Sequence, residues 1–288
     1  MTTIPKIHPT ERCSLAECPV WDALGQRLIY IDLADPHLVE LDVRTGELRR
    51  TVLSLPPPLG GLYLRDSGKT AVVCADGVFG LDREYAVDAR LYPPHASFSA
   101  APPNDSTIHR GHVFVATADR KERLPTAGLF LLDRDNSFRR LLGGLTVGNG
   151  PAFAPDGRTM YLADSPRGVI TAYDWRADCL SLENPRVFAS VQPSDGLPDG
   201  LAVDASGGVW NARWGGGSVV RYAPNGTEKE RIDLPARFAT SCAFGGENLR
   251  TLFITTARGL GVSKDDLGGH LFSAELEVSG LPASLAQP

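Results

Sequence analysis

The chain has 288 residues, 42% of them hydrophobic and 22% charged, and this balance excludes wholesale disorder. Its net charge is −5 at pH 7 and no concentrated run of Lys and Arg occurs, so nucleic acid is not an expected partner. No uncharged apolar stretch reaches the roughly eighteen residues that a membrane-spanning helix needs.

The N-terminal segment and the cysteines indicate the cellular compartment in which the protein is expected. The opening segment, MTTIPKIHPT, lacks the apolar core of a secretory signal. The five cysteines stand at positions 13, 18, 74, 179 and 242, and no two of them form a C-x-x-C pair. This scatter favours neither a disulfide framework nor a thiolate zinc site. We therefore expect a cytoplasmic protein, and no feature of the sequence indicates its oligomeric state.

A turn followed by a β-rich run recurs along the whole chain. The turns are centred near residues 25, 68, 111, 157, 207 and 247, about 40 to 50 residues apart. The runs that follow them cover residues 27–32, 70–74, 113–116, 159–164, 209–212 and 251–256. Most copies continue into a second run, at residues 38–42, 78–82, 129–133, 170–174 and 219–222. The runs are short and β-branched, so they predict strands rather than helices.

A period of this length that holds several short strands is typical of a β-propeller blade. The 30 Gly and 22 Pro fall between the runs as turn residues. Six copies predict an all-β, six-bladed β-propeller that residues 1–288 form as a single domain. Because a propeller usually closes by sharing a blade between the two chain ends, we expect residues 271–276 to pair with an early N-terminal strand. The aromatic residues expected in the blade core are Tyr30, Tyr161, Trp210 and Phe253.

Three Pro-containing segments interrupt the repeat and carry candidate site residues. These are Glu17, Asn149 and Asp199, each five to seven residues before the Asp of the next turn. In a radial repeat, similar offsets correspond to similar positions around the axis, so we expect the three side chains to converge. Two carboxylates and an amide oxygen form a hard-oxygen set that suits a divalent cation. The alternative interpretation, that each residue caps a turn, stays open at this point.

These segments resemble the gluconolactonase/regucalcin (senescence marker protein) family of sugar-lactone hydrolases over roughly residues 14–275. The family's L-G-E-G-P-x-W signature is similar to residues 15–21, where Ala16 and Cys18 replace its two glycines. Its N-G-L/P-x-x-S/A-P-D-G-x-x-x-Y-x-x-D segment is similar to residues 149–164, and its P-D-G-x-x-x-D-x-x-G-x-x-W segment to residues 198–210. Further similarities lie at residues 214–217, 240–246 and 255–258.

The resemblance implies a propeller with one divalent ion in its central channel. The family's metal ligands carry over to Glu17, Asn149 and Asp199, and calcium, zinc, magnesium, manganese or iron(II) could be the ion. Its substrate-binding R-x-N-D segment matches residues 102–105, and this implies substrate contact by Asn104 and Asp105. Glu122, on the following loop, matches a further acidic family residue. Pro102 stands where the family has Arg, so the identity of the lactone stays open.

The resemblance implies hydrolysis of a lactone, expected to be a sugar-acid lactone, to the corresponding hydroxy acid. The metal would act as a Lewis acid and Asp199 as the general base. No G-x-S-x-G elbow or H-E-x-x-H motif offers a serine nucleophile or a zincin site. Two alternatives remain: an esterase or phosphoesterase of similar architecture, and a non-catalytic propeller that binds a small ligand or calcium.

Overall fold

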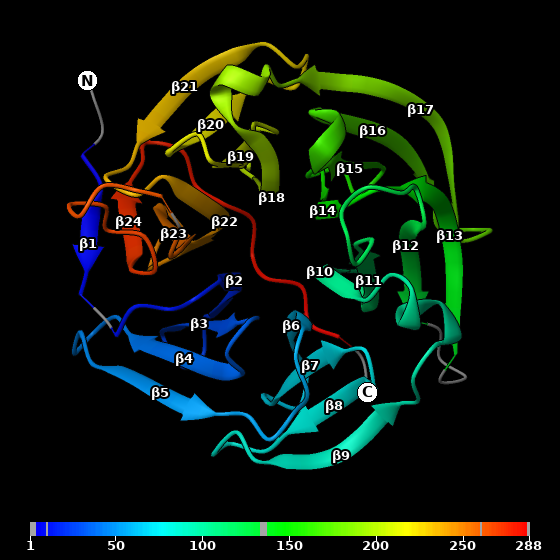
Figure 1. The fold of residues 1–288 in the computed structure, drawn as a ribbon, viewed down its shortest axis with the longest axis horizontal. Coiled ribbons are helices and arrows are strands. Elements are labelled where there is room, and N and C mark those ends of the chain that lie inside the picture. The colour runs from blue at the N-terminus through cyan, green and yellow to red at the C-terminus, as the bar shows by residue number, and fades with distance from the viewer. Residues whose placement is uncertain (1–3, 10, 133–136, 260, 287–288) are drawn as a thin grey trace.

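Six four-stranded antiparallel sheets are arranged around a common axis in a computed structural model of the chain (Figure 1). The structure describes residues 4–9, 11–132, 137–259 and 261–286. Each sheet is one propeller blade, and its strands follow one another from the hub outward. The six-bladed, all-β architecture expected from the repeat is therefore confirmed.

The first three blades use consecutive strands of the chain. Blade 1 consists of β2 (Ala16–Asp22), β3 (Arg27–Asp32), β4 (His37–Asp42) and β5 (Leu48–Val52). Blade 2 consists of β6 (Leu59–Leu64), β7 (Thr70–Cys74), β8 (Gly77–Leu81) and β9 (Val87–Tyr92). Blade 3 consists of β10 (Pro103–His109), β11 (His112–Thr117), β12 (Ala127–Leu132) and β13 (Phe138–Leu145).

The other three blades complete the ring. Blade 4 consists of β14 (Gly148–Phe153), β15 (Thr159–Asp164), β16 (Val169–Arg176) and β17 (Ser181–Ser190). Blade 5 consists of β18 (Leu197–Val203), β19 (Val209–Trp214), β20 (Ser218–Tyr222) and β21 (Glu228–Asp233). Blade 6 consists of β22 (Phe238–Gly245), β23 (Thr251–Ala257), β24 (Leu271–Glu275) and β1 (Lys6–His8).

Blade 6 joins the two ends of the chain. Its outer strand β1 pairs antiparallel with β24, with Lys6 opposite Ser273 and His8 opposite Leu271. The expectation that an N-terminal strand pairs with residues 271–276 is thus confirmed. Three short 3₁₀ helices, η1 (Ala96–Ser99), η2 (Ser165–Arg167) and η3 (Pro193–Asp195), lie between strands. Among the described residues, no helix has the length and apolar character that a bilayer crossing requires.

The hydrophobic core lies between neighbouring blades. Ile29 and Ile31 of blade 1, for example, belong to the same buried cluster as Leu62 and Val72 of blade 2. The four aromatic residues expected in the core are all at most 5% exposed: Tyr30, Tyr161, Trp210 and Phe253. Since each sheet buries both faces only against its neighbours, a single blade has no core of its own.

The C-terminal segment crosses the middle of the ring after β24, as the red trace in Figure 1 shows. The N–H of Ala205 donates to the carbonyl of Ser279 at 2.8 Å. Further along, the N–H of Ala286 donates to the carbonyl of Leu64 at 2.9 Å. The segment therefore connects blade 5 with blade 2 across one end of the hub. The repeat pattern gave no indication of this connection, because the crossing follows no β period.

Candidate functional site

The innermost strands of all six blades surround the axis, and each contains a break in its pairing register (Figure 1). In blade 1 the break lies between Glu17 and Val20, and in blade 4 between Asn149 and Ala152. In blade 5 it lies between Pro198 and Leu201, so Asp199 falls within it. Such β-bulges bend the strand and redirect side chains out of the regular alternation. The three candidate residues therefore sit at corresponding irregularities of the hub.

Glu17, Asn149 and Asp199 are all buried near the axis, with exposed fractions of 5%, 5% and 6%. Burial raises the pKa of Glu17 well above its usual range, and the negative charges of Asp199 and Asp105 raise it further. Burial likewise raises the pKa of Asp199 well above its usual range, with Asp105 adding to the effect. Mutual electrostatic influence across blades 1, 3 and 5 requires that these carboxylates lie close together.

Asn104 and Asn149 connect blades 3 and 4 by direct hydrogen bonds. The Nδ2 of Asn104 donates to Asn149 Oδ1 at 2.7 Å and to the carbonyl of Gly148 at 3.1 Å. The Nδ2 of Asn149 in turn donates to the hydroxyl of Ser165 at 2.9 Å. These bonds fix the amide of Asn149 so that its oxygen faces Asn104, and the Oδ1 of Asn104 takes no part in them.

Asp105 is buried in the hub, with an exposed fraction of 5%, and it lines a cavity there. Its carboxylate accepts hydrogen bonds from the N–H groups of Gly150 and Ser106, both at 2.7 Å. It also accepts one from the thiol of Cys18 at 3.6 Å. Burial raises the pKa of Asp105 to about 6, although the two N–H groups act in the opposite direction. Asp105 thereby links the residues that follow Glu17 and Asn149.

Glu122 lies on the exposed loop between β11 and β12. It adopts a left-handed backbone conformation, with φ of 56°, and its N–H donates to the carbonyl of Asp119 at 2.9 Å. The Asp119 carboxylate caps the same loop through the N–H groups of Lys121 and Arg123. The charge of Glu122 contributes to the raised pKa of Asp199, so this loop of blade 3 lies near enough to the hub to act on Asp199.

The donor set fits a divalent cation through the chemistry of its oxygens. Within the described residues, no Lys, Arg or His forms an ion pair with Glu17, Asp105 or Asp199. Buried carboxylates without a positive partner are costly, and a bound cation removes that cost. In the same part of the chain, no three His, Cys, Asp or Glu side chains are grouped to hold a metal by themselves. The oxygen donor expected from the sequence in addition to the two carboxylates is the amide of Asn149, which is buried and fixed by Asn104 and Ser165.

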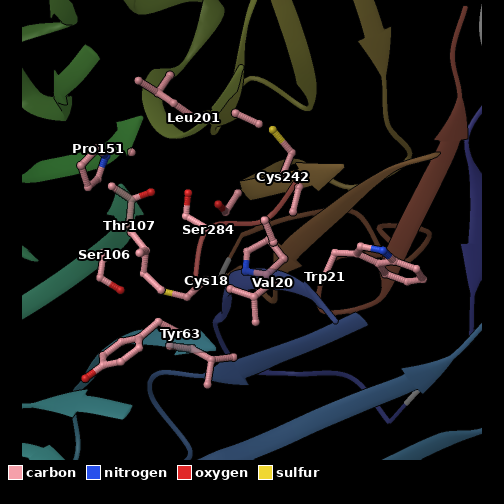
Figure 2. Close-up of a pocket in the computed structure, with 18 of the residues that line it drawn as sticks. Cys18, Val20, Trp21, Tyr63, Ser106, Thr107, Pro151, Leu201, Cys242 and Ser284 are labelled. Carbon is pink, nitrogen blue, oxygen red and sulfur yellow. The ribbon is translucent and has the colours of Figure 1, made fainter. Parts of the chain in front are cut away.

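A cavity of about 200 Å³ occupies another level of the hub (Figure 2). Cys18, Ser106, Pro151, Leu201 and Cys242 of five blades line it, while Glu17, Asn149 and Asp199 do not. Cys18 and Pro151 lie within the register breaks of their strands, and the other three follow theirs. The crossing C-terminal segment covers this end, and Figure 2 shows Ser284 among the lining side chains. Asp105, whose charge acts on both Glu17 and Asp199, also lines this cavity, so the cavity borders the carboxylate cluster.

Sequence reasoning missed the residues that support the cluster from neighbouring strands. Ser165 fixes the Asn149 amide, and Asn211 of β19 donates to the backbone at Asp199 and Gly200. Cys18 occupies a left-handed conformation, with φ of 51°, which only its place beside a register break explains. No linear motif marks the roles of Ser165 and Asn211, because their partners are 11 to 16 positions away along the chain.

Comparison with known proteins adds three findings. Residues 15–258 match the family model described as SMP-30/Gluconolactonase/LRE-like region. A 6-deoxy-6-sulfogluconolactonase of Pseudomonas putida is 32% identical over 92% of each chain, and a pentonolactonase of Haloferax volcanii is 30% identical over 97% of each chain. A solved structure of a calcium-binding protein, regucalcin, from Agrobacterium tumefaciens superimposes with a TM-score of 0.92 at 23% identity, over 100% of this chain and 99% of that one. The last similarity concerns the fold alone.

Proposed function

Because this chain belongs to the SMP-30/gluconolactonase/LRE-like family, we propose that it hydrolyses a sugar-acid lactone in a reaction that depends on a divalent metal. The enzyme class, a lactonase, rests on curated lactonase relatives that align with nearly the whole chain. The observation that carries the metal dependence is the group of buried carboxylates at the hub, which has no cationic partner among the described residues.

Glu17, Asn149 and Asp199 would hold the metal: they combine two buried carboxylates with a fixed amide oxygen at the register breaks of three blades. A divalent ion bound there supplies Lewis-acid polarisation of a lactone carbonyl. Glu17 serves as a ligand and keeps its orientation through the Cys18 N–H, which donates to Glu17 Oε2 at 3.0 Å. The Asn149 amide is held by Asn104 and Ser165 on its two sides.

Asp199 is the proposed general base. Its carboxylate has two oxygens, so one remains available to accept a proton from a water molecule that attacks the lactone carbonyl carbon. The ring C–O bond then breaks, the proton passes to the departing ring oxygen, and the hydroxy acid results. Burial and the charge of Asp105 raise the pKa of Asp199, and a cation bound beside it would act in the opposite direction and favour the ionised form that a general base needs.

Asn104 is the proposed substrate-positioning residue at the cluster. Both Nδ2 protons are used within the protein, so its Oδ1 is the atom that can accept a hydrogen bond from a substrate hydroxyl. Glu122, on the loop between β11 and β12, is a second candidate for binding a substrate hydroxyl. Pro102 is buried and contributes only its carbonyl, which accepts from the N–H of Ala118 at 3.0 Å. The chain thus contributes no cationic side chain at that position.

Removal of divalent metal is expected to abolish lactone hydrolysis. The protein is treated with a chelator, its metal content is measured by elemental analysis, and proton release is followed over a panel of aldonolactones. We expect turnover to fall to the uncatalysed rate and to return when calcium, manganese, magnesium, iron(II) or zinc is added back. Unchanged turnover in metal-free protein would show that hydrolysis does not depend on a divalent metal. Binding of metal without hydrolysis of any lactone would favour a non-catalytic propeller.

A further inference from the structure

Asn211 is a polar side chain with no exposed surface in the second strand of blade 5. It lies in β19, opposite Leu201 of β18 and Val220 of β20. Its strand neighbours Trp210 and Ala212 belong to the apolar cluster between blades 5 and 6. Because side chains alternate along a strand, Asn211 faces blade 4 instead. An uncharged amide enclosed at this position needs a structural or functional explanation.

The Nδ2 of Asn211 donates hydrogen bonds to the backbone of the register break that contains Asp199. It donates to the carbonyl of Asp199 at 3.0 Å and to the carbonyl of Gly200 at 3.4 Å. Pairing runs from Pro198–Arg213 directly to Leu201–Asn211, so Asp199 and Gly200 together oppose only Ala212. The bulge therefore lacks the regular ladder bonds, and the amide replaces backbone donors for both carbonyls.

The oxygen of the Asn211 amide has a less favourable environment than its nitrogen. Asn211 Oδ1 is buried and has no hydrogen-bond partner within the described structure. The opposite orientation of the amide would set this oxygen against two carbonyl oxygens, so the two acceptors determine the assignment. Asn211 thus leaves an acceptor unsatisfied in order to bond the bulge, and an apolar residue would avoid that penalty.

Blade 6 also has a buried polar side chain at the corresponding position, Thr255. Thr255 lies opposite Ser241, the first residue after the register break of β22, just as Asn211 lies opposite Leu201. The hydroxyl of Thr255 donates to the carbonyl of Ser241 at 3.3 Å and accepts from its N–H at 3.1 Å. Thr240, the extra residue of the blade 6 bulge, donates its own hydroxyl to that of Thr255 at 2.9 Å. In two neighbouring blades, a polar side chain of the second strand thus bonds the innermost strand at its register break.

The bulge of blade 5 is confined on its other side as well. A Cβ atom on Gly200 would lie 2.2 Å from the hydroxyl of Ser241, so the backbone of β18 packs directly on blade 6. The close approach of Gly200 restricts movement of the strand toward blade 6, and the Asn211 bonds hold it on the other side. A one-residue change of register at this point would reverse the face to which Asp199 points.

We propose that Asn211 is a positioning residue, which holds the bulge of β18 so that the Asp199 carboxylate points into the hub. The expected effect of Asn211 on turnover rests on the proposed function, because it requires that Asp199 act in lactone hydrolysis. Its structural part, the direction of Asp199, does not depend on which reaction the protein catalyses.

The test compares Asn211→Thr with Asn211→Val, which have the same shape and differ in one hydroxyl. We expect Thr to keep kcat within about 3-fold of the unchanged protein, as Thr255 serves blade 6. We expect Val to lower kcat by about 10- to 100-fold at saturating metal, with KM within about 3-fold, because small misplacement of a reacting group has effects of this size. Val209→Ala, a buried substitution on the same strand, should lower the unfolding temperature and leave kcat unchanged.

Crystal structures of the two Asn211 variants provide a readout that does not need turnover. A displaced Asp199 carboxylate in the Val variant, restored in the Thr variant, would support the proposal even if no lactone were hydrolysed. An unmoved carboxylate in the Val variant, or equal kcat for Val and Thr, would overturn it. If the Val variant does not fold, the Asn211→Ser and Asn211→Ala pair repeats the comparison with a smaller side chain.

Discussion

Asp199→Asn is expected to lower kcat/KM for the best lactone by about 10³-fold or more, the largest effect of any single substitution in the site. Asn keeps the volume of the side chain and one oxygen that can face a cation, but it cannot accept the proton of an attacking water. Because a buried carboxylate with a raised pKa is replaced by a neutral group, the metal-free protein should be no less stable.

The control is Asp233→Asn, the same chemical change at an exposed position on the outer strand of the same blade. Turnover is measured by proton release at saturating metal, and unfolding temperatures of both variants are compared without metal. Turnover by Asp199→Asn within 10-fold of the unchanged protein would show that another group accepts the proton.

Glu17→Gln is expected to lower the affinity for a divalent ion by at least about 100-fold, with a matching loss of turnover at limiting metal. The substitution removes one of the two negative charges proposed to contact the ion. It retains an oxygen that can accept from the Cys18 N–H, as Glu17 Oε2 does at 3.0 Å. Since the charges of Asp199 and Asp105 oppose ionisation of Glu17, the metal-free variant should unfold at an equal or higher temperature near neutral pH.

The matched control is Glu47→Gln, which changes an exposed carboxylate in the β4–β5 turn of the same blade. Calorimetric titration with calcium and manganese gives the affinities of both variants. A Glu17→Gln protein that binds both ions as tightly as the control would remove Glu17 from the ligand set. Lower stability without metal would mean that the carboxylate has a structural role instead.

The architecture could be predicted from the sequence because turns and strands leave local signals. The Asp156-Gly157 turn, for example, precedes β15 as expected, and its Gly157 adopts a φ of 66° that Gly reaches without strain. Six repeats of this unit predict a closed ring, since each blade must bury both faces of its sheet against the two adjacent blades. The pairing of β1 with β24 followed from the need to close that ring.

The detailed geometry of the site could not be predicted in the same way. Offsets within the repeat placed Glu17 and Asn149 at matching registers, opposite Ile31 and Ala163, but Asp199 lies one residue further on within its bulge. A bulge has no sequence period, because it depends on bonds from other strands such as those of Asn211. The link between Cys18 and Asp105 likewise joins blades that are distant in the chain.

The most direct test of the central claim is the location of a bound divalent ion by anomalous X-ray scattering from crystals soaked in manganese. One peak is expected at the hub, within about 2.0–2.6 Å of oxygens from Glu17, Asn149 and Asp199. A peak elsewhere, or none at manganese concentrations that sustain lactone hydrolysis, would contradict the account.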